Sequence, residues 1–261
     1  MNTNSNTYTV IYSIILVVVV AAVLAFAAMF LKPTQDANVK KDTISQILTA
    51  AGVEYTEGAN VLEVYKDSID KAILVNVDGT VLPETLVTSN VDSLQVYGNS
   101  DLKTQMVAAT EGKPAKFPVY IFKNGVTVVP CYGAGLWGPI WGYVGLEKDL
   151  KTIKAVCFGH KGETPGLGAK IADEPSFAEG FVGKTIGEGE ILFEVCKPAN
   201  TQVDANNHID AISGATITSQ ALGFTLNQWF GFYKNYLAKN AAQEVVEDVV
   251  LDVEPVNTVE E

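Results

Sequence analysis

The chain contains no arginine, and all 18 of its basic residues are lysines. Its 30 acidic residues leave a net charge of −12. A planar guanidinium clamp on a phosphate group is therefore excluded. The excess negative charge argues against a nucleic-acid partner and against charge-driven docking onto an anionic lipid surface. Any bound phosphate must be held by backbone N–H groups, hydroxyls, lysine or a covalent bond.

Cysteine and histidine are scarce. The cysteines Cys131, Cys157 and Cys196 are isolated and form no CxxC pair. An iron–sulfur or zinc site made by this chain alone is therefore not expected, and we predict no metal site. We expect the cysteines to be small buried apolar residues, with a Cys157–Cys196 disulfide as the alternative in an oxidising compartment. The lone histidines, His160 and His208, are predicted to have hydrogen-bonding or surface roles.

Two catalytic signatures are also missing. We find no nucleophilic triad and no Gly-x-Gly-x-x-Gly fingerprint following a strand. The sequence therefore predicts no catalytic residues and no NADH site in this chain.

A long apolar run is present near the N-terminus. Residues 10–31 are apolar apart from Ser13 and would span about 33 Å as a helix, which matches the hydrocarbon core of a bilayer. Residues 1–7 carry no lysine or arginine, and no small-x-small cleavage site follows the run. We therefore predict a retained single-pass anchor rather than a signal peptide. Lys32, Lys40 and Lys41 follow the run, and the positive-inside rule alone would place the following domain in the cytoplasm.

The chain divides into three predicted parts. Residues 1–32 hold the transmembrane helix at about 10–31, and residues 33–242 form an α+β domain. Residues 243–261 have seven carboxylates and no lysine, so we predict a disordered acidic tail.

Within the domain, local patterns predict several elements. Residues 43–52 are predicted to be a short helix. Residues 118–123 and 126–130 flank Asn124-Gly125 and predict a hairpin. Residues 133–144 mix glycines with two tryptophans, which is typical of a loop that approaches a flat group; the alternative is a glycine-rich turn with its tryptophans in the core. From Ser219 onward, a helix of about five turns is predicted, and its apolar face comprises Leu222, Leu226, Trp229, Tyr233 and Leu237.

Residues 210–219, Asp-Ala-Ile-Ser-Gly-Ala-Thr-Ile-Thr-Ser, are the most informative segment. Four hydroxyl side chains and a glycine precede the amphipathic helix. A threonine at such a small-residue turn can expose its oxygen, to which a phosphate can be esterified. The alternative is an ordinary helix start capped by Ser213, Thr218 or Ser219.

Two motifs carry a resemblance to a known family. Residues 210–216 resemble the acceptor motif of the FMN-binding domain family, in which FMN is joined through its phosphate to the last threonine of Ser/Thr-Gly-Ala-Thr. Residues 162–168, Gly-Glu-Thr-Pro-Gly-Leu-Gly, resemble the loop that lies against the flavin in that family. Both motifs occur in the expected order, with the FMN-binding region at about 117–240.

A third block refines the resemblance. Residues 133–144 are similar to the Gly-Leu-Trp…Gly-Tyr block in the C subunits (NqrC) of sodium-translocating NADH:quinone oxidoreductases. The G subunit of the related Rnf-type electron-transport complex shares the other two motifs but is usually shorter and lacks this block. That G subunit, or a membrane-anchored binding domain without redox chemistry, remains the alternative.

The resemblance implies a mixed α/β FMN-binding domain with a covalent phosphoester between FMN and Thr216. It also implies a set of residues around the cofactor: Ser213, Gly214, Ala215, Thr218, Glu163, Thr164, Gly166, Leu167, Gly168 and Trp137.

The resemblance also implies a cellular role. The chain would relay electrons within the complex, beside the membrane-embedded B, D and E subunits and indirectly with the NADH-oxidising F subunit. A separate flavin transferase would attach the FMN. The domain would lie on the periplasmic face of the bacterial inner membrane, against the weak lysine signal described above.

Overall fold

The computed structural model describes residues 6–56, 58–86 and 95–251, without the side chains of 84–85 and 242–251. These residues form two compact units, one up to Asp42 and one from Thr43 onward. The mixed helices and sheet of the second unit confirm the predicted α+β class.

Helix α1 (Asn6–Ala50) is one continuous helix of 45 residues with Pro33 inside it. The apolar side chains of 10–31 are exposed in the described structure, and α1 is long and apolar enough to cross a membrane. The prediction of a separate short helix at 43–52 was wrong, because Thr43–Ala50 is the last part of α1. One proline did not end the helix, although it removes one backbone donor from the ladder.

The second unit is built on an antiparallel sheet with the strand order β2-β1-β3-β4-β5-β6. The hairpin predicted around Asn124-Gly125 is confirmed as β3 and β4. The strands are β1 (Ile69–Val75), β2 (Val81–Thr85), β3 (Phe117–Phe122), β4 (Thr127–Ala134), β5 (Pro139–Leu146) and β6 (Ile153–His160).

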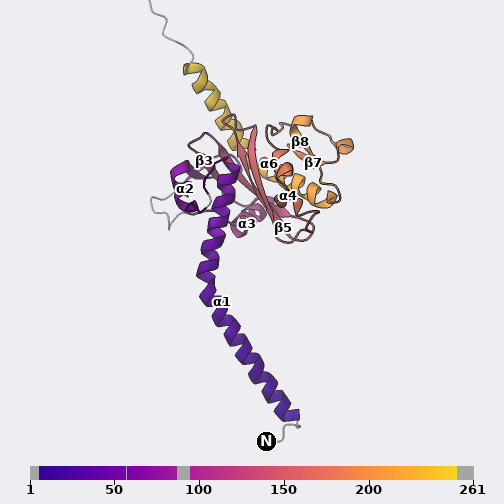
Figure 1. The fold of residues 1–261 in the computed structure, drawn as a ribbon. Helices are drawn as coiled ribbons and strands as arrows, with labels where there is room; N and C mark the ends of the chain where they lie inside the picture. The colour runs from indigo at the N-terminus through magenta and orange to yellow at the C-terminus, as the bar shows by residue number, and fades with distance from the viewer. Residues whose placement is uncertain (1–5, 57, 87–94, 252–261) are drawn as a thin grey trace, which may run out of the picture. The chain divides into compact units, whose positions relative to one another are not determined.

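Helices lie on both sides of the sheet (Figure 1), and side chains from both of its faces are buried. Side chains alternate along β3, so Phe117 and Val119 enter one core while Tyr120 and Phe122 enter the other. Helices α3 (Asn99–Thr110) and α6 (Thr216–Leu251) contribute to the first core. The last turns of α1 and helix α2 (Val61–Ser68) contribute to the second.

Helix α6 buries the apolar face that the sequence predicted. Trp229 Nε1–H donates to the carbonyl oxygen of Tyr132 at 2.7 Å, and the Tyr233 hydroxyl donates to Pro118 O at 2.8 Å. These bonds satisfy the polar atoms of two aromatic side chains that are at most 1 % exposed. The helix begins at Thr216, not Ser219, and continues to Leu251, past the start of the predicted tail. Residues 252–261 lie outside the described structure.

The prediction of a loop at 133–144 was wrong for most of the segment. Residues 133–134 end β4, residues 139–144 belong to β5, and only 135–138 form the turn between these paired strands. The glycines of this segment are explained by crowding in the sheet. A Cβ at Gly142 would overlap the Phe158 ring, and a Cβ at Gly133 would overlap the Thr225 side chain of α6. Close packing against large neighbours thus produced a composition that is typical of a loop.

The chain after β6 contains short elements. Two short helices lie here, and Glu174 separates them. The three cysteines are free, so the alternative of a Cys157–Cys196 disulfide is not realised. No group of three or more potential metal ligands occurs among the described residues. The elements are α4 (Lys170–Asp173), α5 (Pro175–Glu179) and the parallel strands β7 (Glu194–Cys196) and β8 (His208–Asp210).

The contact between the last turn of α1 and the sheet generates a stability prediction. A Cβ at Gly145 in β5 would overlap the carbonyl oxygen of Ala50, a backbone atom that cannot rotate away. We expect Gly145→Ala to lower the free energy of unfolding by about 1–3 kcal/mol, as overpacking does. Urea unfolding of the full chain in detergent measures the change.

Gly231→Ala is the matched control. Gly231 lies in α6, and no atom lies within 4 Å of the position that a Cβ would take there. Its substitution should raise stability by about 0.5–1 kcal/mol, because alanine favours the helix. Equal effects of the two changes would contradict the packing argument.

Candidate functional site

Three separate segments meet at the buried carboxylate of Glu163. They are the loop 162–168, the turn 135–138 between β4 and β5, and the first turn of α6. Glu163 is 4 % exposed. Its Oε1 accepts the backbone N–H of Trp137 at 2.9 Å, and its Oε2 accepts the Thr218 hydroxyl at 2.6 Å. One side chain therefore ties together residues that are 26 and 55 positions away from it in sequence.

The loop enters this arrangement directly from β6. His160, the last residue of the strand, accepts the backbone N–H of Glu163 at its Nδ1, at 3.2 Å. A Cβ at Gly135 would lie 2.5 Å from Glu163 Oε1, and one at Gly168 would lie 2.6 Å from Oε2. Glycine at both positions leaves room for the carboxylate. We call the two glycines and the two hydrogen-bond donors around this carboxylate the Glu163 cage.

The loop then turns and packs against residue 214. The carbonyl oxygen of Thr164 accepts the N–H groups of Leu167 and Ala169, both at 3.1 Å. Gly166 and Gly214 have φ angles of +73° and +79°, which glycine adopts without strain. A Cβ at Gly214 would lie 3.0 Å from Leu167 Cδ2, whereas Gly166 has open space at that position.

The start of α6 uses its hydroxyls in an unexpected way. The carbonyl oxygen of Ala215 accepts the first helical hydrogen bond, from the Ser219 N–H at 3.0 Å. Alanine has no side-chain oxygen that could cap the first turn. The Ser219 hydroxyl accepts the N–H of Ile212 at 3.0 Å, and Thr218 donates to Glu163. Thr218 and Ser219 therefore do not cap the helix, and this part of the alternative is wrong. The first-turn N–H groups, which attract anions, lie beside Thr216.

The two threonines of this turn differ in access. Thr218 is 1 % exposed and its hydroxyl is engaged. Thr216 is the first residue of the helix and is half-buried. A hydroxyl that accepts a phosphate must be reachable, so the geometry favours Thr216 over Thr218.

Large apolar side chains surround this turn without being buried. Trp137 is 67 % exposed, Leu167 is 42 % and Ile217 is 59 %. Exposed apolar groups on three converging segments are typical of a ligand or partner surface. Sequence analysis did not predict Ile217 as a site residue. Its signal is that it is apolar but lies outside the apolar face of α6, directly after Thr216.

The structure thus brings the eleven predicted site residues into three adjoining segments. The small residues Ser213, Gly214 and Ala215 precede Thr216, and the loop Thr164 to Gly168 lies against them through Leu167.

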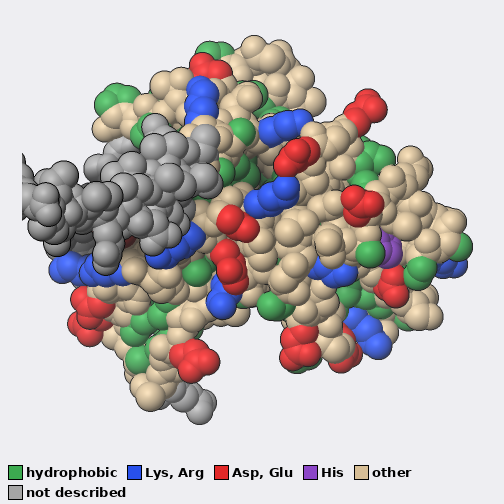
Figure 2. Space-filling view, turned by 90° about the horizontal axis from the view of Figure 1, so that it is seen from above, with side chains coloured by type: hydrophobic (Ala, Val, Ile, Leu, Met, Phe, Trp, Pro, Cys, Tyr) green, Lys and Arg blue, Asp and Glu red, His purple; other side chains and the backbone are tan. Residues whose placement is uncertain are grey.

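Charge does not dominate the molecular surface that is visible in Figure 2, where lysine and carboxylate side chains are interspersed.

Known proteins resemble this chain over most of its length. The family described as the FMN-binding domain matches residues 135–230. The chain is 31 % identical over 250 residues to the C subunit of the Na(+)-translocating NADH-quinone reductase of Haemophilus ducreyi, covering 90 % of this chain and 93 % of the relative. It is 28 % identical over 244 residues to the corresponding C subunit of Pseudomonas aeruginosa, covering 88 % and 93 %.

Solved structures agree with these relatives. The same C subunit of Parabacteroides distasonis shares a TM-score of 0.63 and 32 % identity, covering 79 % of this chain and 96 % of that one. NqrC from Shewanella oneidensis shares a TM-score of 0.59 and 25 % identity, covering 79 % and 99 %.

The Glu163 cage generates a coupling prediction. Thr218→Val removes a hydrogen bond to a buried carboxylate and should lower the free energy of unfolding by about 1.5–3 kcal/mol. In a Glu163→Gln background the acceptor is neutral, so the same change should cost about 1 kcal/mol. Urea unfolding of the four proteins in the cycle measures the difference.

Thr104→Val is the control for the loss of a hydroxyl. Thr104 donates to Ser100 O on the exposed surface of α3. Its substitution should change stability by about 0.5 kcal/mol or less. Additive effects of Thr218→Val and Glu163→Gln would show that the carboxylate does not hold the helix.

Proposed function

The chain belongs to the family of the C subunits of Na(+)-translocating NADH-quinone reductases, and from this premise we propose that it is the membrane-anchored flavoprotein of such a reductase. In this proposal it carries FMN as a phosphoester on Thr216 and relays electrons between other subunits. The observation that carries the attachment site is the bond from Thr218 to Glu163, which engages one threonine of the acceptor turn. Thr216 is left as the accessible threonine hydroxyl there.

The proposed phosphate position uses the start of α6. The first-turn N–H groups and the positive end of the helix dipole favour an anion beside Thr216. This compensates for the absence of arginine. Ser213, Gly214 and Ala215 are small, so the backbone can lie close to the phosphate and the ribityl chain.

The proposed ring position lies on the exposed apolar side chains. Leu167 and Trp137 would cover parts of the isoalloxazine ring and exclude water from it, and Gly166 has open space where other residues carry a Cβ. Thr164 and Gly168 hold the loop in place through backbone bonds and close packing. When bound, FMN would supply the electron chemistry, while these residues orient the ring and adjust its potential.

The proposed anchor is the apolar part of α1, which would tether the domain to a membrane. From the resemblance, we place the domain on the periplasmic face of a bacterial inner membrane, with electron partners among the membrane-embedded B, D and E subunits. The NADH-oxidising F subunit would reach it only indirectly. From the same resemblance, a separate flavin transferase would load the FMN.

The attachment proposal makes a mass and fluorescence prediction. Thr216→Ala, co-expressed with a flavin transferase, should yield folded protein whose denatured chain is colourless. Wild-type protein should carry the mass of one FMN less one water. Thr216→Ser retains a hydroxyl and should keep some covalent flavin, and Thr218→Val should keep it too. Covalent flavin on the denatured alanine variant would contradict the assignment.

The loop proposal makes a spectral prediction. Gly166→Val introduces a branched side chain into the open space beside Leu167, so it should shift the flavin absorbance and its midpoint potential while leaving attachment intact. Gly166→Asn is the control for backbone strain, since asparagine tolerates positive φ. An unchanged spectrum and potential in the valine variant would remove this loop from the flavin environment.

The orientation proposal makes a labelling prediction. Lys113 is 68 % exposed at the end of the turn after α3, so Lys113→Cys provides an accessible thiol. A membrane-impermeant maleimide should label it in bacterial cells with a permeabilised outer membrane. The wild-type chain, whose three cysteines are free, controls for background labelling. Labelling only after lysis of the cells would place the domain in the cytoplasm.

A further inference from the structure

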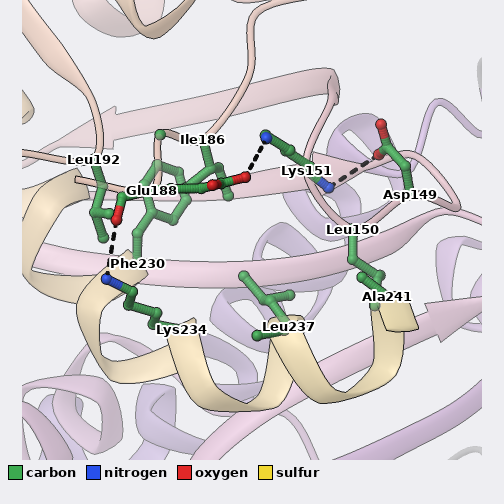
Figure 3. A pocket seen from close by; sticks show the side chains of 12 residues that line it. Asp149, Leu150, Lys151, Ile186, Glu188, Leu192, Phe230, Lys234, Leu237 and Ala241 are labelled. Carbon is green, nitrogen blue, oxygen red and sulfur yellow. Dashed lines mark hydrogen bonds and ion pairs between the residues drawn. The ribbon is translucent and has the colours of Figure 1, made fainter. Parts of the chain in front are cut away.

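A cavity lies along residues 230–241, in the middle of α6 (Figure 3). Its lining includes Phe230, which follows Thr216 by fourteen positions, or about 21 Å along the helix. The other wall is formed by residues 149–151 and 186–192. The cavity is therefore separate from the proposed flavin position.

The floor of the cavity is apolar. It is formed by side chains that are each less than a tenth exposed, and the cavity has a volume of about 220 Å³. This volume is smaller than that of pockets for drug-sized ligands, so only a slender ligand fits. The apolar side chains are Leu150, Ile186, Leu192, Phe230 and Leu237.

Leu150 is held over this floor in an unusual conformation. Its φ of +54° makes it the one non-glycine residue with positive φ among those the structure describes. Its N–H donates to Glu147 O at 2.8 Å, and Asp149 Oδ1 accepts the N–H groups of Lys151 and Thr152. A bulky residue in a left-handed turn is uncommon, and such turns cluster at functional sites.

Two lysines flank the mouth, and both contact Glu188, Lys151 at its carboxylate and Lys234 at its backbone carbonyl. Lys151 Nζ contacts Glu188 Oε1 at 2.7 Å, and Lys234 Nζ donates to the carbonyl oxygen of Glu188 at 3.3 Å. The Glu188 side chain is 86 % exposed and can turn outward. The hydrogen bond and charge of Lys151, with a smaller effect of Lys234, hold the pKa of Glu188 below its ordinary value. The mouth of the cavity is therefore favourable for a carboxylate.

We propose that this cavity binds a single-chain fatty-acid carboxylate. Its alkyl chain would lie on the apolar floor, and its carboxylate would replace that of Glu188 between Lys151 and Lys234. The two oxygens of Asp149 accept three hydrogen bonds within its own turn, so Asp149 is held there while the charge of Lys151 also acts on it. A neutral alkyl chain would fill the floor but leave the two ammonium groups without a partner on the ligand. This proposal is independent of the FMN assignment.

The test uses the full chain in digitonin, whose rigid sterol does not mimic an alkyl chain. Dodecanoate carrying a diazirine is photo-crosslinked, and the labelled peptides are identified by mass spectrometry. Label is expected on the peptides that contain residues 149–151 and 230–241. Unlabelled dodecanoate should compete for this label at lower concentration than dodecanol, because only the acid meets both lysines.

Three variants sharpen the test. Lys234→Ala should raise the half-competing concentration of dodecanoate about three- to fivefold, as expected for a partly exposed ion pair. Glu188→Gln removes the carboxylate that competes with the ligand for Lys151, so it should lower the half-competing concentration of dodecanoate. Neither should change competition by dodecanol. Ala238→Phe fills the cavity and should abolish the label, while Lys113→Ala is the surface control without effect.

Circular dichroism and the flavin spectrum of each variant show that the fold and the flavin site are intact. Equal competition by dodecanoate and dodecanol in all variants would overturn the proposed role of the lysines. Label that is absent from the cavity peptides, or that persists in a folded Ala238→Phe variant, would overturn the site itself.

Discussion

The buried carboxylate of Glu163 is the contact on which the candidate site depends. It joins the β4–β5 turn, the loop after β6 and the first turn of α6 through two short hydrogen bonds. A carboxylate placed in such a buried position needs donors, because its charge is costly to remove from water. The site therefore requires Trp137 N–H and the Thr218 hydroxyl at once. Gly135 and Gly168 are needed equally, since a side chain at either position would displace the carboxylate.

The sheet makes that meeting possible. Strands β4, β5 and β6 are adjacent and antiparallel, so β4 and β6 run in the same direction. The turn that follows β4 and the loop that follows β6 therefore lie at the same end of the sheet. Helix α6 packs on the same sheet through Trp229 and Tyr233, whose polar atoms bond to the backbone of Tyr132 and Pro118. This packing fixes the rotation of α6 and directs Thr218 to Glu163. The proposed phosphate position at Thr216 is consequently set by core packing well away from it.

The opposite face of the sheet packs against the last turns of α1. The apolar side chains in the last turns of α1 are buried there, with Ile44, Ile47 and Leu48 at 0 % exposed. The Trp141 indole of β5 also donates to Gln46 Oε1 at 2.9 Å. The helix that carries the apolar run thus also supplies part of the core of the domain. Sequence patterns could not show this, because the apolar run and the buried turns are separated by the polar residues around Pro33.

Local patterns in the sequence were sufficient to predict the apolar helix, the β3–β4 hairpin and the apolar face of α6, and a short motif located the turn that we propose as the FMN acceptor. These features depend on local periodicity or on short contiguous motifs, which a linear reading detects. Tertiary structure decided what depends on contacts between distant residues. The glycines of 133–144 indicate a loop in isolation, yet the Phe158 and Thr225 side chains that occupy their space make them part of a sheet. The motif singled out Thr216 by resemblance, but no local pattern distinguishes the two hydroxyls of Thr216 and Thr218 physically. The approach of Glu163, 55 residues earlier in the chain, engages the Thr218 hydroxyl.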